Sequence, residues 1–183
     1  PRREMAVDAI VTGHYFEYAK NYVFEGEKHD FWELLYVDKG EVEVMADSTG
    51  YRLRQGDMIF HKPDEFHNVF ANGVVAPNLV VVSFVCRSAA MSYFEGKILR
   101  LDGDERALLS RLVAEARDAF ASPLDDPRTV QMVRASSSAF GSEQMVVSLL
   151  EQMLIRMVRR GAEQAREVKV SSSVKRRSDH DLA

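Results

Sequence analysis

The sequence predicts a mainly β fold followed by two α-helices, and three observations support this prediction. Short strand-like runs recur through the first hundred residues, turn-forming residues separate them, and the apolar pattern changes to a helical period near Asp102. With 183 residues, 46% of them hydrophobic and 28% charged, the chain has the size and composition of one globular domain.

Three turns divide the first half of the chain into strands. They lie at Asp38-Lys39-Gly40, between Asp47 and Gly50, and at Gln55-Gly56-Asp57. The segment from Glu41 to Met45 alternates between polar and apolar residues, as a half-buried strand does. The run from Pro77 to Arg87 is apolar and rich in β-branched residues. Short strands at this spacing predict a sandwich or a barrel.

The first helix begins after Asp102. Asp102 and Glu105 have the spacing of an N-terminal capping box, with aspartate in the place of serine. Apolar residues then recur three and four positions apart as far as Phe120, which predicts a helix with one apolar face. Ser122-Pro123 ends it. The stretch 124–141 follows neither period, and the sequence predicts no element for it.

The second helix is expected from Ser142 to Arg160, with Ser142 as N-cap and Gly161 as C-cap. Its apolar residues form two adjacent rows, which is more apolar surface than one contact on a small barrel needs. The helix is therefore either deeply buried or packed on a partner chain as well. After Gly161 the sequence turns polar, which predicts a linker over residues 162–183.

The charges are unevenly distributed. The net charge is −4, yet residues 159–177 carry seven basic residues against two acidic ones. The acidic remainder does not suit a polyanion, and the basic stretch is interpreted as a solvated linker. No apolar run reaches the roughly 20 residues that span a bilayer. A single cysteine, Cys86, allows no internal disulfide, so we expect a cytoplasmic protein without a membrane partner.

Residues that can carry chemistry gather between Glu27 and Val37. If this segment is one strand, Glu27, His29, Phe31, Glu33 and Leu35 share a face, polar at one end and apolar at the other. Such a face suits a small-ligand cavity. With His67 it also offers two imidazoles and two carboxylates to a divalent metal. Solvated glutamates and a histidine that caps a carbonyl are the third interpretation.

The spacing of these residues resembles the cupin superfamily. His29, Glu33 and Gly40 match the first cupin motif, and Gly56, Pro63 and His67 match the second. Glu27 stands where the first motif has its other histidine. The resemblance implies a jelly-roll barrel whose metal ligands would be Glu27, His29, Glu33 and His67. Glutamate binds metals as well, so the metal alternative remains open.

The segment WELLYVDKGEVEVMADSTGYRLRQGDMIFHKPDEFHNVF, from Trp32 to Phe70, resembles more narrowly the effector-binding domain of AraC-type transcription regulators. The resemblance implies an effector-binding cupin barrel over residues 1–100, a helical dimerisation region packed on it over 101–161, and a basic linker over 162–183. The DNA-binding helix-turn-helix units of such regulators are absent, because the residues after Gly161 are too few to form one. This chain is then expected to be the sensing part of a longer regulator.

Several expectations follow from that resemblance. The chain is expected to bind a small-molecule effector, a sugar or a small acid, and to catalyse no reaction. The pocket would be lined by Glu27, His29, Phe31, Glu33, Leu35 and His67, without a cofactor. Dimers would form through the helix from Ser142 to Arg160, and DNA would be bound only through the missing domain. The alternative is a metal-dependent cupin enzyme, an oxygenase or sugar isomerase.

Overall fold

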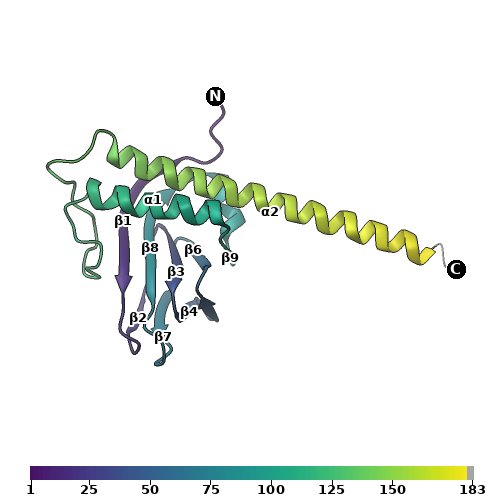
Figure 1. The fold of residues 1–183 in the computed structure, drawn as a ribbon, viewed down its shortest axis with the longest axis horizontal. Helices are drawn as coiled ribbons and strands as arrows, with labels where there is room; N and C mark the ends of the chain where they lie inside the picture. The colour runs from purple at the N-terminus through teal and green to yellow at the C-terminus, as the bar shows by residue number, and fades with distance from the viewer. Residues whose placement is uncertain (181–183) are drawn as a thin grey trace.

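The computed structural model describes the backbone of residues 1–180 and the side chains of residues 1–166, and it has two antiparallel sheets (Figure 1). Sheet A has the order β1-β8-β3-β6-β9, with the bounds Val7–Glu17, Asn78–Cys86, Trp32–Lys39, Asp57–His61 and Ile98–Arg100. Sheet B has the order β2-β7-β4-β5, with the bounds Val23–Glu27, His67–Ala71, Glu41–Ala46 and Thr49–Arg54. This is the cupin-type jelly-roll barrel followed by two helices that the sequence predicts.

The three predicted turns join consecutive strands. Gly40 separates β3 from β4, residues 47–48 separate β4 from β5, and Gly56 precedes β6. Gly40 has φ +79° and Gly56 has φ +96°, values that glycine adopts without the steric cost other residues meet. Turn chemistry therefore located the strand boundaries here.

The alternation along β3 places its side chains on the two faces of sheet A. Trp32, Leu34 and Tyr36 face outward into an apolar cluster shared with the helices. Leu35 and Val37 face inward into a second cluster between the sheets. Trp32 therefore belongs to the cluster shared with the helices, on the face of β3 opposite Leu35.

Two helices cover the outer face of sheet A (Figure 1). Helix α1, Gly103–Ala119, follows a short 3-10 helix, η1, Ala89–Phe94, and strand β9. Its predicted capping box is present: the Glu105 N–H donates to Asp102 Oδ1 over 2.9 Å, and the Asp102 N–H donates to Glu105 Oε1 over 3.0 Å. The cap satisfies backbone donors that the first turn leaves free.

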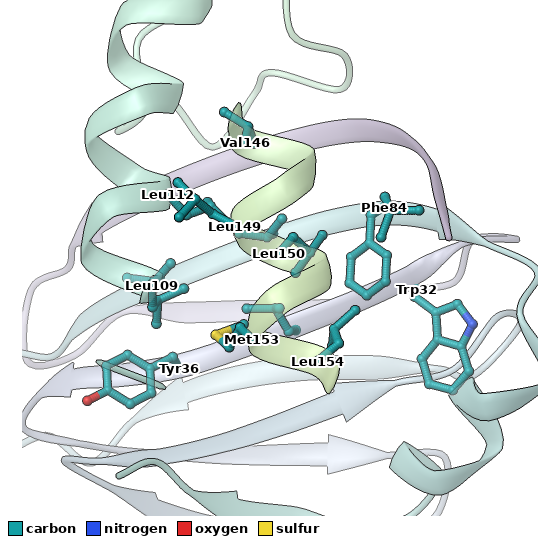
Figure 2. Close-up of a cluster of buried hydrophobic side chains, with 14 of the residues drawn as sticks. Trp32, Tyr36, Phe84, Leu109, Leu112, Val146, Leu149, Leu150, Met153 and Leu154 are labelled. Atoms are coloured by element: carbon teal, nitrogen blue, oxygen red, sulfur yellow. The ribbon is translucent and has the colours of Figure 1, made fainter. Parts of the chain in front are cut away.

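Helix α2, Ser142–His180, packs beside α1 on the same face. Figure 2 shows its apolar side chains directed toward α1 and the strands below, where Leu150, Met153 and Leu154 are fully buried. Of the two alternatives for its apolar rows, deep burial within the chain accounts for most of them. Only a few apolar residues of its described part remain half-buried.

The expected helix end at Gly161 is wrong, because α2 continues to His180 and projects past the barrel (Figure 1). Residues 162–180 of the expected linker are therefore helical, and residues 181–183 lie outside the described residues. Gly161 serves close packing instead: a side chain there would overlap the Tyr93 ring and hydroxyl. Ala162 to Arg166 are strong helix formers, so the helix passes a glycine that costs about 1 kcal/mol.

Two further findings concern the chain as a whole. Cys86 is buried at the end of β8, and its thiol donates to the Ala6 carbonyl over 3.3 Å. Among the helices of the described residues, none combines the length and the apolar character required to cross a membrane.

Candidate ligand-binding site

A cavity of about 350 Å³ lies inside the barrel, between the inner faces of sheets A and B. Residues of β1, β2, β3, β7 and β8 line it, together with the connection between α1 and α2. All six predicted pocket residues contribute to the lining: Glu27, His29, Phe31, Glu33, Leu35 and His67. The structure thus brings the six together, and their binding role remains a prediction.

The expectation that Glu27, His29 and Glu33 share one strand is wrong. Glu27 ends β2 in sheet B, whereas Glu33 lies on β3 in sheet A, and His29 belongs to the connection between them. The chain crosses from one sheet to the other at residues 28–31, so the two carboxylates face each other across the barrel. The two carboxylates come close because this short connection joins the two sheets, not because the residues alternate along one strand.

The strand register places further polar residues beside the predicted ones. Directly opposed residues in antiparallel strands point to the same face. The pairs Thr12↔Ser83, Ser83↔Glu33 and Glu33↔His61 make a continuous row across sheet A. Glu27↔His67 is the matching pair in sheet B. One layer of the barrel is therefore polar, while the layers below it hold Leu35, Val81, Leu79 and Val69.

The centre of this polar layer is a cluster of two carboxylates and two imidazoles, which we call the Glu27–His67 cluster: Glu27, His29, Glu33 and His67. His67 Nε2 lies 3.3 Å from Glu27 Oε1 and 3.1 Å from Glu33 Oε2. His29 Nε2 lies 3.6 Å from Glu27 Oε1 and from Glu33 Oε1, which is longer than a hydrogen bond, and it has no hydrogen-bond partner among the described residues.

The two Nδ1 atoms of the cluster hold the rings in place. His29 Nδ1 lies 3.0 Å from the Phe31 carbonyl oxygen, and His67 Nδ1 lies 3.1 Å from the Glu65 carbonyl oxygen. A carbonyl only accepts, so each Nδ1 carries a proton and each Nε2 is directed at the carboxylates. This backbone support fixes both imidazoles in orientation.

The environment sets the charge of two members of the cluster. Burial raises the pKa of the Glu33 carboxyl, but interactions with His29 and His67 outweigh burial and hold that pKa far below its usual range. Burial lowers the pKa of the His67 imidazole, while hydrogen bonds to Glu27 and Glu33 raise it to about 10. At neutral pH the structure thus holds an ionised Glu33 against a protonated His67.

The donor set of the Glu27–His67 cluster also fits a metal ion. One ligand atom from each of the four residues lies within 4.8 Å of the others, and within the part of the chain that the structure describes His29 Nε2 has no hydrogen-bond partner. Two imidazole nitrogens with two carboxylate oxygens suit divalent first-row metals. Histidines that bind metals characteristically hold their second nitrogen on a carbonyl, as His29 and His67 do.

Aromatic side chains of β1 form another part of the wall. His14, Phe16 and Tyr18 occupy alternate positions of the strand extending into its loop, and all three line the cavity. Their rings stack in sequence, with centroids 4.5 Å and 4.8 Å apart. These stacked rings make this part of the cavity wall largely aromatic. Tyr15 points the other way and donates to Asp38 Oδ2 over 2.6 Å.

The connection between α1 and α2 covers one side of the cavity. Its residues Pro127, Thr129 and Val130 belong to the lining. It is attached to β1 by backbone hydrogen bonds from Tyr15 to Leu124 over 3.0 Å and from Met132 to Val11 over 3.1 Å. The stretch 124–141, for which the sequence predicts no element, therefore forms part of the site.

Sequence reasoning missed several residues of the polar layer. His61 is fully buried, stacks on His67 with ring centroids 4.5 Å apart, and places Nδ1 3.1 Å from Glu65 Oε1. Ser83 donates to Glu33 Oε1 over 3.3 Å. A lone polar residue inside the apolar run of β8 was a usable signal for Ser83. No local signal marked His61, because only strand pairing places it beside Glu33.

Residues 11–158 match the family model described as the AraC-like ligand binding domain. No curated protein matches. Similar solved structures include apo ToxT of Vibrio cholerae, 9% identical, with 80% of this chain and 55% of that chain covered at a TM-score of 0.49.

Two cupins are also similar. The cupin domain of Cnp3 from Schizosaccharomyces pombe is 12% identical, with 44% of this chain and 59% of that chain covered at a TM-score of 0.40. An RmlC-like cupin from Shewanella frigidimarina is 17% identical, with 45% and 83% covered at a TM-score of 0.37. The chain spans 55% of the ToxT structure and 59% of the Cnp3 domain.

Proposed function

The chain belongs to the family of AraC-like ligand-binding domains, and from this premise we propose that it senses a small molecule for a transcription regulator. Ligand in the barrel would modulate DNA binding by a helix-turn-helix domain elsewhere in the full protein, in the cytoplasm and without catalysis. The observation that carries the proposal is the cavity of about 350 Å³, which combines apolar walls with convergent polar groups.

Two routes connect cavity and helices. The strands of sheet A carry cavity-facing and helix-facing residues in alternation, as with Leu35 and Tyr36 on β3. The α1–α2 connection contributes Thr129 to the cavity wall and then leads directly into α2. A ligand that contacts both the strands of sheet A and the α1–α2 connection would favour one arrangement of α2 over another. A population shift requires such a difference in affinity between two arrangements.

A variant that fills the cavity tests whether the ligand binds there. We expect a metabolite that binds at about 100 times its Kd to raise the melting temperature by about 5–10 °C. Val81→Trp fills the cavity and should abolish the shift, whereas Val74→Trp, at a side chain 78% exposed and outside the lining, should keep it. Differential scanning fluorimetry with a metabolite library measures this. A shift that survives Val81→Trp would place the ligand elsewhere.

Dimerisation is proposed through α2. The apolar residues Val147, Ile155 and Val158 remain half-buried, and the helix extends past the barrel (Figure 1). A second copy covering these side chains would bury them by a two-fold contact. We propose that the barrel of residues 1–100 senses the ligand and that the helical region of residues 101–161 joins the copies.

This arrangement predicts a dimer that one charge disrupts. Light scattering after gel filtration should give twice the mass of one chain for the wild type and a single mass for Ile155→Lys. Ala114→Lys, at an exposed position of α1, should remain dimeric. A monomeric wild-type chain, or a dimeric Ile155→Lys variant, would contradict the interface.

A second candidate function, a metal-dependent cupin enzyme such as an oxygenase or sugar isomerase, is favoured by the unpartnered His29 Nε2 within the Glu27–His67 cluster. Glu27, His29, Glu33 and His67 would hold the metal, which when bound supplies Lewis-acid chemistry. The proposed regulator needs no metal, because the His67 proton already balances one carboxylate.

Elemental analysis separates the two candidate functions. For protein purified without chelator or metal resin, we expect far less than one equivalent of Fe, Mn, Ni or Zn. One equivalent of metal that is lost in the His29→Ala variant would support the metal-dependent alternative, provided that it is retained in Glu43→Gln, a change at an exposed side chain.

A further inference from the structure

The first part of the α1–α2 connection is a loop whose two ends are held together. The Ala121 N–H donates to the Val133 carbonyl over 2.8 Å, and the Ala135 N–H donates to the Ala119 carbonyl over 2.9 Å. We call the residues between these ends the 122–132 loop. A compact loop with joined ends can open as one unit while the helices on either side stay in place.

The 122–132 loop is attached to β1 near both of its ends. The Leu124 carbonyl accepts from the Tyr15 N–H over 3.0 Å and from His14 Nδ1 over 3.1 Å. The Met132 N–H donates to the Val11 carbonyl over 3.1 Å. Leu124 and Met132 are themselves buried in the apolar cluster beside the helices. The attached loop is therefore the stable form, and an open form is a minority state.

The middle of the 122–132 loop borders the mouth of the cavity. Pro127, Thr129 and Val130 line the cavity, and Val130 is 84% exposed. Of the lining residues in the described part of the chain, the exposed ones are Pro127, Val130 and Glu27 at the end of β2. Exposed residues of the lining mark the place where the cavity reaches solvent. The mouth therefore lies between the loop and the end of β2.

We propose that the 122–132 loop is a lid, which detaches locally from β1 to admit the effector and is held in place again when Thr129 and Val130 contact the bound ligand. The inference rests on the proposed function and names how access to its cavity is controlled. A single exposed valine is ordinary on a protein surface. At the mouth of a ligand cavity, however, an apolar ligand would cover its side chain, and this burial favours the closed loop.

His14 connects the ligand to the lid. Its ring lines the cavity and stacks on Phe16 with centroids 4.5 Å apart, while its Nδ1 faces the loop. Since a carbonyl only accepts, Nδ1 carries a proton and donates it to Leu124. A ligand packed against this ring would restrict the ring and keep that hydrogen bond formed. Ligand binding and loop closure therefore favour each other.

Amide hydrogen exchange followed by NMR measures the opening residue by residue. The amides of Tyr15 and Met132 bond across the contact between loop and β1, and we expect them to exchange about tenfold faster than those of β8, because the loop opens without global unfolding. His14→Phe keeps a ring but loses the donor, and should raise their exchange about fivefold. His14→Asn can place an amide N–H near the position of Nδ1 and should restore most of the protection.

A fluorescent probe tests closure over a ligand. N-phenyl-1-naphthylamine is uncharged and brightens in apolar surroundings, so stopped-flow fluorescence gives its rates of binding and release. At about ten times its Kd, the dye should slow exchange of the Tyr15 and Met132 amides about tenfold. Val130→Ser should release the dye about fivefold faster at an unchanged melting temperature, because the side chain is exposed. Val74→Ser, similarly exposed and outside the lining, should leave release unchanged.

The outcomes distinguish the lid from the proposed function. Equal exchange at the loop contact and in β8 would show that the loop opens only on global unfolding, which would overturn the lid. Dye that binds the wild type but not Val81→Trp, and leaves loop exchange unchanged, would overturn the lid and keep small-molecule sensing intact. Unchanged release from Val130→Ser would overturn its contact with the ligand. If the dye did not bind, or bound Val81→Trp equally, both the lid and the proposed sensing cavity would be contradicted.

Discussion

Replacing Arg160 with alanine is expected to lower the free energy of unfolding by about 3 kcal/mol, because it leaves the buried carboxylate of Glu105 without its charged partner. Arg160 donates from Nε to Glu105 Oε2 over 3.0 Å and from Nη2 to Glu105 Oε1 over 2.7 Å. The Glu105 side chain is fully buried, and without Arg160 its one remaining hydrogen-bond donor among the described residues is the N–H of Asp102. Arg160 also donates to the Arg100 carbonyl, which ties α2 to β9.

Chemical denaturation followed by circular dichroism measures this effect. Arg156→Ala is the matched control, since Arg156 lies one turn earlier on α2 and pairs with Asp104, whose side chain is 81% exposed. An exposed pair contributes about 0–1 kcal/mol, so this variant should remain close to the wild type. Equal losses from both variants would show that burial of Glu105 is not the cause.

Leu150→Ala should lower the free energy of unfolding by about 2–5 kcal/mol. Leu150 is fully buried in the cluster shared by α1, α2 and the outer face of sheet A (Figure 2). Truncation removes transfer free energy and leaves a cavity between elements that are too rigid to close it. The midpoint and the slope of the urea denaturation curve together give this free energy of unfolding.

Gln152→Ala provides the comparison within the same helix. Gln152 is exposed, and alanine has the higher helix propensity, so this variant should lie within about 0.5 kcal/mol of the wild type. A small loss for Leu150→Ala would mean that α2 detaches from the sheet at little cost. The helix would then be a poor candidate for transmitting ligand binding.

Local features of the chain were predictable because their causes are local. The capping box of Asp102 and Glu105 needs only residues three apart, and it forms as predicted. The two faces of β3 follow from its alternation, so Trp32 lies outside and Leu35 inside. Glycine at the turn before β4 has the positive φ that its position requires.

The sequence grouped residues that line one cavity, but it predicted the wrong elements to carry them. Glu27, His29 and Glu33 line one cavity, yet two sheets and a connection supply them, where the sequence predicts one strand. Period two cannot distinguish a continuous strand from two strands whose connection preserves the parity. The family resemblance identified the residues without determining which sheet held each.

Other errors have non-local causes. His61 joins the polar layer because β6 pairs with β3, a pairing between segments far apart in the chain. The 124–141 stretch covers the cavity through hydrogen bonds to β1, more than a hundred residues earlier. Gly161 resembles a C-cap in sequence, but the Tyr93 ring packs against it inside a continuing helix.

The sequence by itself determined the fold class, the family, and the two faces of β3. These depend on periods of two and 3.6 residues, on turns and caps, and on the motif from Trp32 to Phe70. Only the tertiary structure decided that His29 Nε2 lies 3.6 Å from a carboxylate oxygen of each of Glu27 and Glu33, and that the α1–α2 connection forms a cavity wall. Such contacts depend on strand pairing across the barrel, which no local pattern of residues encodes.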